Sequence, residues 1–141
     1  MTRKTKIINS DPVRLLLIDD EKDFVDIVSK RLKRRNMDIS KAYSGTEAIR
    51  VLRGQEFDVA VLDLKMEDMD GIEVLKVFKM MDPQLVVIML TGHGSAKDAG
   101  LGIKLGAFDY LTKPCELEDL VEKIMEAYAH RKRDERGIDV S

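Results

Sequence analysis

The chain has 141 residues, of which 44% are hydrophobic and 35% are charged, and its formal net charge is −2. These values predict one globular domain with its own hydrophobic core and exclude a disordered chain. They also argue against general nucleic-acid binding, which needs a strongly basic surface, and no apolar run is long enough to span a membrane.

Cys115 is the only cysteine, which excludes an intramolecular disulfide and a cysteine-based metal site. This cysteine usage fits the reducing cytoplasm, where we expect the protein to work. The first six residues are basic in character, but only two apolar residues follow them, so they do not form a signal peptide. Residues 1–12 are polar, end in Asp11-Pro12, and are predicted to form a flexible N-terminal arm.

Apolar runs that predict strands alternate with segments of helical periodicity along the rest of the chain. In chain order the predicted strands are residues 13–18, 37–42, 59–63, 85–90 and 108–112. The predicted helices follow them in turn and include residues 24–32, 47–52, 72–81, 98–105 and 117–128.

Several of these helices have recognisable ends. Ser44 and Glu47 form a capping box before the second helix, and Gly54 is expected to end it. The last helix, which starts at Leu117, has the clearest amphipathic pattern. We expect it to end near His130, so that residues 131–141 form a charged C-terminal tail behind a domain of residues 13–130.

Regular alternation of strand and helix predicts the α/β class, with a doubly wound parallel sheet and helices on both faces, as in flavodoxin-like folds. The first, third and fourth strands are continuous apolar runs, which is typical of strands buried on both faces. The second and fifth are shorter or more polar and fit the sheet edges. These properties favour the strand order 2-1-3-4-5.

The carboxyl ends of the predicted strands carry the residues with the most reactive chemistry. Asp19 and Asp20 follow the first strand, Asp63 ends the third, Thr91 follows the fourth and Lys113 follows the fifth. Ligands bind at this edge of such sheets. Three clustered carboxylates repel one another unless a cation lies among them, and Mg²⁺ prefers such oxygen ligands. A lysine and a hydroxyl beside the ion would hold phosphate, so the pattern predicts phosphoryl transfer with a carboxylate nucleophile.

The helix that ends near Leu105 contains two internal glycines, Gly100 and Gly102. Each weakens a helix by about 0.5–1 kcal/mol relative to alanine, so alanine at both positions is expected to stabilise the protein. Leu101 and Leu105 are predicted to form an exposed apolar pair for a partner or a second copy. Three other residues are predicted to pack inward: Ala96, Ala99 and Ile103. The alternative is that the glycines allow the helix to pack closely on the sheet.

Together, four motifs resemble the receiver domain of bacterial two-component response regulators over about residues 13–130. The motifs are Leu17-Ile18-Asp19-Asp20-Glu21, Val61-Leu62-Asp63, Leu90-Thr91-Gly92-His93-Gly94 and Tyr110-Leu111-Thr112-Lys113-Pro114. The stretch from Leu90 to Pro114 is most similar to receivers attached to enhancer-binding transcription activators.

The resemblance implies that Asp63 accepts a phosphoryl group from a phosphohistidine on a sensor histidine kinase or a phosphotransfer protein. It implies Mg²⁺ bound by Asp20, Asp63 and the backbone carbonyl of Lys65, with Asp19 acting mainly through water. Lys113 would pair with Asp63 and then with the phosphate.

The remaining implied roles concern the switch and its lifetime. Thr91 would move to bind a phosphate oxygen, and Tyr110 would turn inward behind it. The signal would then reach the face formed by the helix ending near Leu105, the strand 108–112 and the last helix, where a downstream protein or a second copy binds. Lys65 and His93 would tune dephosphorylation. A cis peptide bond is implied between Lys113 and Pro114, which fits the weak trans preference of proline.

Other functions remain open at this point. A haloacid-dehalogenase-like phosphatase usually carries a second Asp two residues after the nucleophile, where this chain has Lys65, and 141 residues leave little room for a cap domain. A nucleotide-binding protein is disfavoured because no phosphate-binding glycine fingerprint is complete. A receiver-like module that binds partners without phosphorylation is the third alternative. Residues 131–141 are too few for a DNA-binding domain, so we expect either a single-domain regulator or the receiver of a multidomain protein.

Overall fold

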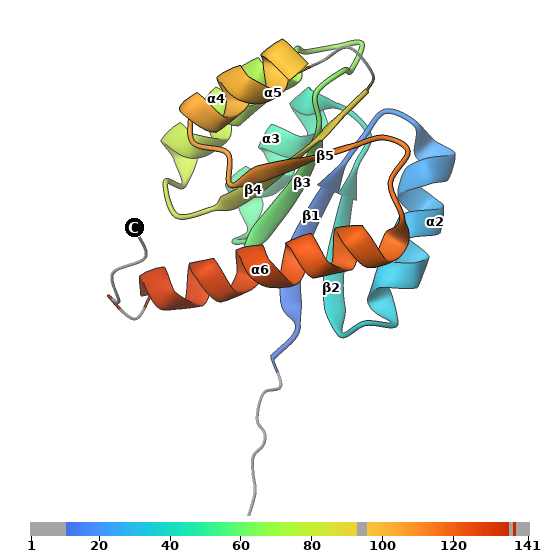
Figure 1. Cartoon of the computed structure of the whole chain (residues 1–141), viewed down its shortest axis with the longest axis vertical. Coiled ribbons are helices and arrows are strands. Elements are labelled where there is room, and N and C mark those ends of the chain that lie inside the picture. Colours follow the sequence, from blue (N-terminus) through green and yellow to red (C-terminus); the bar gives the residue numbers. More distant parts are fainter. Residues whose placement is uncertain (1–10, 93–95, 136, 138–141) are drawn as a thin grey trace, which may run out of the picture.

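The computed structural model describes residues 11–92, 96–135 and 137. Within these residues one sheet of five parallel strands has the order β2-β1-β3-β4-β5 (Figure 1). The strands are β1 Val13–Ile18, β2 Met37–Ala42, β3 Val59–Asp63, β4 Val86–Thr91 and β5 Asp109–Thr112. The predicted α/β class, strand order and flavodoxin-like architecture are confirmed.

Helices cover both faces of the sheet, with α2 and α6 on one side and α3, α4 and α5 on the other (Figure 1). Their bounds are α2 Lys22–Lys33, α3 Gly45–Gly54, α4 Gly71–Met81, α5 Ala96–Lys104 and α6 Leu117–Glu135. Each face has its own apolar cluster, because successive strand residues point to opposite sides of the sheet. In the part of the chain that the structure describes, none of the helices is both long and apolar enough to cross a membrane.

Burial along the strands explains their order. Every residue of β3 and β4 is buried, whereas β2 and β5 alternate between buried or half-buried and exposed positions. A fully apolar strand is destabilised if one of its sides faces water. Such strands therefore occupy the centre of the sheet, and the more polar strands lie at its edges. One half of the predicted capping box is present, since the Ser44 hydroxyl accepts a hydrogen bond from the Glu47 backbone N–H at 3.0 Å, whereas the Glu47 carboxylate accepts one from the backbone N–H of Tyr43 rather than of Ser44.

Helix α6 is longer than the sequence pattern indicated. It continues to Glu135 instead of ending near His130, so the start of the predicted tail is helical. The reason is Arg131, which is only 5% exposed and lies 3.9 Å from the Asp58 carboxylate and 2.9 Å from that of Glu135. The charge of Arg131 favours an exposed tail, but its ion pairs with Asp58 and Glu135 hold the end of α6 against the domain.

The faces of α5 differ in part from the predicted ones. Leu101 is exposed and Ala99 is buried, as expected, but Ala96 and Ile103 are exposed and Leu105 packs against the core. Gly102 lies on the side of α5 that faces the sheet, and its close contact with β4 determines which side of the helix is buried. A Cβ built there would lie 2.1 Å from the sulfur of Met89, so the close-packing alternative holds at Gly102, whereas a Cβ at Gly100 would meet open space.

The two glycines of α5 are therefore expected to respond to alanine in opposite directions. Gly102→Ala should lower the free energy of unfolding by about 1 kcal/mol, because the fully buried Met89 must repack and its flexibility limits the cost. Gly100→Ala should raise it by about 0.5–1 kcal/mol through helix propensity alone. Urea unfolding of both variants measures this, and a stabilised Gly102→Ala protein would contradict the packing account.

Candidate functional site

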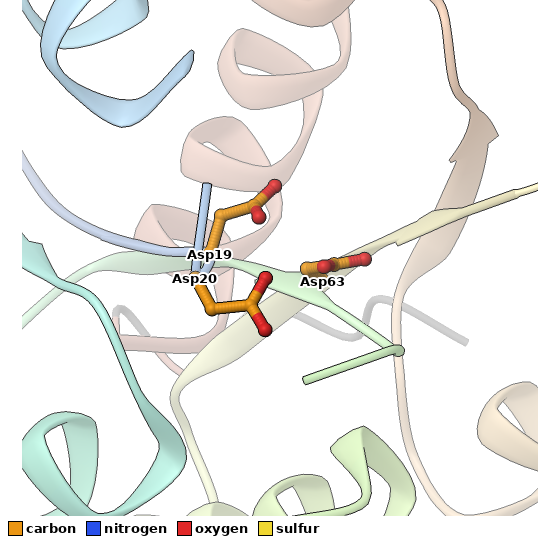
Figure 2. Close-up of side chains that lie close together, drawn as sticks. All are labelled: Asp19, Asp20 and Asp63. Carbon is orange, nitrogen blue, oxygen red and sulfur yellow. The ribbon is translucent and has the colours of Figure 1, made fainter. Parts of the chain in front are cut away.

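Three carboxylates gather at the carboxyl edge of the sheet, as predicted. Ile18 pairs with Leu62 in the register of β1 and β3, so the next residues, Asp19 and Asp63, are neighbours. One carboxylate oxygen from each of Asp19, Asp20 and Asp63 lies within 4.8 Å of the other two (Figure 2). Asp19 is fully buried, Asp63 is 6% exposed and Asp20 is half-buried, so the cluster opens to solvent on the side of Asp20.

Crowding changes the acidity of the cluster. Burial and the neighbouring charge of Asp19 raise the pKa of Asp63 from its ordinary value of 3.8 to about 7. The positive charge of Lys113 and a 3.3 Å hydrogen bond from the Lys65 backbone N–H oppose this rise without cancelling it. Because the carboxylate is destabilised by its surroundings, a divalent cation bound among these oxygens would relieve the repulsion. The all-oxygen donor set fits a hard ion such as Mg²⁺.

Lys113 reaches the cluster from the end of β5, but it does not form the predicted pair with Asp63. Its ammonium lies 2.8 Å from the Asp19 carboxylate and 2.8 Å from that of Glu21, and 4.5 Å from the centroid of the Phe24 ring. Burial alone would lower the pKa of Lys113, but its hydrogen bonds to the two acids raise it above its ordinary value. The lysine is therefore held on the β1 side of the cluster.

Glu21 is a member of the site that the sequence analysis did not select. The hydrogen bond from Lys113 holds the pKa of the Glu21 carboxyl below its ordinary value. The signal for it was its place directly after Asp19-Asp20, between β1 and α2. Which of several acids a long lysine side chain chooses depends on the fold, so the sequence alone offered no basis for this pair.

The loop between β3 and α4 is fixed by backbone contacts around Asp63. Gly71 packs so closely that a Cβ there would lie 2.5 Å from the Cα of Leu64 and 2.8 Å from the carbonyl oxygen of Asp63. Asp68 accepts hydrogen bonds from the N–H groups of Gly45 and Thr46 at the start of α3. These contacts restrict the position of Asp63, the residue at which β3 gives way to the loop.

The remaining predicted residues are distributed around this centre. Thr91 ends β4, is 3% exposed, and its carbonyl accepts a hydrogen bond from the Lys113 backbone N–H. Tyr110 lies on the edge strand β5 and is 43% exposed. Lys65 is exposed beside Asp63, and His93 lies outside the described residues. The peptide bond between Lys113 and Pro114 is cis, which confirms that expectation.

Removing the Asp63 charge should stabilise the metal-free protein in a pH-dependent way. A carboxyl with a pKa of about 7 in the folded state favours folding below about pH 4, and this advantage is lost as the pH rises to 7. Asp63→Asn does not titrate, so its gain over the wild type should grow from near zero at about pH 4 to about 4 kcal/mol at pH 8. Urea unfolding in a chelator measures this; a gain that is independent of pH would contradict the raised pKa.

Comparison with known proteins identifies relatives of this chain. A family model described as the response regulator receiver domain matches residues 15–125. The transcriptional regulatory protein GlrR of Escherichia coli K12 is 35% identical over 116 residues, which cover 82% of this chain and 26% of GlrR. TrcR of Mycobacterium tuberculosis is 34% identical over 131 residues, which cover 93% of this chain and 51% of TrcR.

Solved structures give the same result. A response regulator receiver domain protein of Clostridium thermocellum has a TM-score of 0.82 and 34% identity, and the match covers 85% of this chain and 97% of that one. NtrX of Brucella abortus, crystallised with ADP, has a TM-score of 0.85 and 25% identity over 92% of this chain and 31% of NtrX. The chain thus spans between a quarter and a half of the length of the curated regulators named above.

Proposed function

The chain belongs to the response regulator receiver domain family, and on this basis we propose that it is a phosphorylation-activated switch. Asp63 accepts a phosphoryl group from the phosphohistidine of a sensor kinase or a phosphotransfer protein. The observation that carries the proposal is the convergence of Asp19, Asp20 and Asp63 within 4.8 Å, with the Lys113 ammonium in contact with the cluster. We propose that the protein works in the cytoplasm. Its single cysteine fits that reducing compartment, where the proposed phosphoryl donors would be found.

In this proposal the acidic cluster holds Mg²⁺ through Asp20, Asp63 and the backbone carbonyl of Lys65, with Asp19 acting through water. When bound, the ion would neutralise the crowded carboxylates and the phosphoryl oxygens. The support in the molecule is chemical: three carboxylates share one small volume, and burial together with the charge of Asp19 raises the pKa of Asp63 to about 7. The residues present therefore fit a magnesium site.

The transfer forms one bond and breaks another. A carboxylate oxygen of Asp63 attacks phosphorus, the P–N bond to the donor histidine breaks, and the imidazole leaves with the bonding electron pair. Lys113 and Thr91 bind the phosphoryl oxygens on the resulting acyl phosphate. Water later hydrolyses this bond, and Lys65 and His93 tune that step. The domain is thus not a turnover enzyme; it catalyses only its own phosphorylation and dephosphorylation.

Phosphorylation would be read out on the face formed by α5, β5 and α6. Thr91 moves toward the phosphoryl group and Tyr110 turns inward from its exposed position. Four large apolar side chains on these elements are exposed: Leu101, Ile103, Tyr110 and Met125. Such a surface suits a protein partner, and we propose either a downstream target or a second copy in that place, not a membrane or a nucleic acid.

Beryllofluoride, which mimics a phosphoryl group on Asp, tests the proposal. With Mg²⁺ it should bind the wild-type protein and shift the amide resonances of Asp63, Thr91 and Tyr110, and without Mg²⁺ it should not. A phosphatase would instead release phosphate continuously from small phosphoesters. A module that works without phosphorylation would give no beryllofluoride binding, and either result would contradict the proposed function.

A further inference from the structure

The position of Lys113 poses a question about the proposed switch. Its ammonium has two acidic partners at equal distance, with Asp19 Oδ2 and Glu21 Oε1 each 2.8 Å away. It forms no ion pair with Asp63 in the part of the chain that the structure describes. The ammonium has three N–H donors and these two acids take two of them, so its present contacts hold it on the side of Asp19 and Glu21, away from Asp63.

The two partners differ in how firmly they are held. Asp19 is fully buried, and its second oxygen accepts a hydrogen bond from the Glu21 backbone N–H at 3.0 Å. The Glu21 side chain is 65% exposed and has Lys113 as its ion-pair partner. Exposed pairs contribute little because water solvates the separated charges well, whereas leaving a buried carboxylate alone costs far more. Lys113 can exchange Glu21 for another anion while it stays on Asp19.

The local backbone supports a specific use of the Glu21 side chain. Glu21 is the N-cap residue of α2, yet its side chain accepts no capping hydrogen bond from the helix. The side chains that usually cap the free N–H groups of the first turn are the shorter Ser, Thr, Asp and Asn, so the Glu21 carboxylate is not tied to the helix. Here the carboxylate is directed to Lys113 instead, and Phe24 in the first turn of α2 borders the same ammonium.

We propose that Glu21 is a positioning residue that holds Lys113 on the Asp19 side and competes for it with the phosphoryl group on Asp63. The inference rests on the proposed function, because the competition matters only if Asp63 is phosphorylated. Glu21 makes the unphosphorylated arrangement more favourable, and so it lowers the affinity of the site for a phosphoryl group. In this proposal the Lys113 ammonium has two positions. In the unphosphorylated protein it contacts Asp19 and Glu21, and in the phosphorylated protein it contacts Asp19 and the phosphoryl group on Asp63.

Glu21→Gln removes the charge and keeps the size of the side chain. At saturating Mg²⁺ this variant should bind beryllofluoride about two- to fivefold more tightly, which is the range expected for loss of one exposed ion pair. The matched control is Glu67→Gln, which removes an equal charge from an exposed residue of the β3–α4 loop near Asp20. In a Lys113→Met background, Glu21→Gln should have no effect on beryllofluoride affinity, because the lysine that carries its effect is gone.

A crystal structure of metal-free Glu21→Gln gives a readout that does not depend on phosphorylation. The ammonium of Lys113 should move to within hydrogen-bond distance of the Asp63 carboxylate while it remains on Asp19. An ammonium that stays in its present position overturns the inference. So does beryllofluoride affinity that is equal in Glu21→Gln and Glu67→Gln. If the ammonium moves but even the wild type fails to bind beryllofluoride, the placement of Lys113 is right and the proposed function is wrong.

Discussion

Replacing Asp63 with Asn is expected to reduce acid-labile phosphate incorporation from acetyl phosphate to below about a hundredth of the wild-type rate, because the variant lacks the carboxylate that attacks phosphorus. The site concentrates its chemistry on this one side chain: Asp19 lies beside it in the register and Lys113 contributes a positive charge. The measurement is the initial rate of radiolabelled phosphate transfer at saturating Mg²⁺.

Two controls make this result specific. Circular dichroism should show that Asp63→Asn folds, since removing a crowded charge is expected to stabilise the metal-free protein. Glu67→Gln changes an exposed acid in the adjacent loop and should label at close to the wild-type rate. Labelling of Asp63→Asn at the wild-type rate would show that another residue is the nucleophile.

The second large effect is expected at the amino-terminal ends of the strands, opposite the acidic cluster, where Asp58 directly precedes β3. Its carboxylate side chain is 2% exposed and accepts hydrogen bonds from the Arg14 backbone N–H at 3.0 Å and from the Arg14 guanidinium at 2.9 Å. It also lies 3.9 Å from the buried guanidinium of Arg131. Asp58→Asn should lower the free energy of unfolding by about 3 kcal/mol at pH 7, because it leaves the Arg131 charge less compensated in a buried position.

This loss should depend on pH with a defined sign. Burial alone would raise the pKa of Asp58, but the hydrogen bonds from Arg14 outweigh it and hold the pKa below its ordinary value. The contribution of the carboxylate is therefore present above about pH 4 and is lost as the pH falls through the pKa of the folded state. Urea unfolding of wild type and variant should converge in acid.

An exposed ion pair provides the comparison for Asp58. Asp26 is paired with Lys41 on the surface, and its side chain is 52% exposed. Asp26→Asn should cost clearly less than Asp58→Asn at pH 7, because water solvates the separated charges of an exposed pair. If Asp58→Asn costs no more than Asp26→Asn, burial of the Asp58 cluster does not stabilise the C-terminal end of α6, and the length of that helix needs another explanation.

Local patterns in the sequence were enough to predict the sheet and the acidic cluster. Val59–Leu62 is an uninterrupted apolar run that ends in Asp63, and such a run predicts both a central strand and the end of that strand at which the carboxylate lies. Parallel strands then bring Asp19 and Asp63 together without any knowledge of side-chain packing. These inferences depend only on the alternation of elements and on which end of each strand carries the polar residue.

Contacts between distant side chains were not predictable in this way. From the sequence alone Gly102 is only a glycine that weakens a helix; its role depends on the contact with the sulfur of Met89. Arg131 likewise fits a charged tail by sequence, and only its position near Asp58 places it in the fold. Lys113 likewise has several acids within reach, and the choice of Asp19 and Glu21 follows from the position of the β1–α2 loop. Each depends on tertiary geometry, for which sequence spacing gives no signal.

Chemical mapping of the phosphoryl group tests the central claim most directly. The wild-type protein is incubated with acetyl phosphate and Mg²⁺, the acyl phosphate is reduced with borohydride, and the resulting homoserine is located by peptide mass spectrometry. The account predicts one modified residue, Asp63, and no modification when Mg²⁺ is chelated. Homoserine at Asp19 or Asp20 instead, or none at any residue, would contradict it.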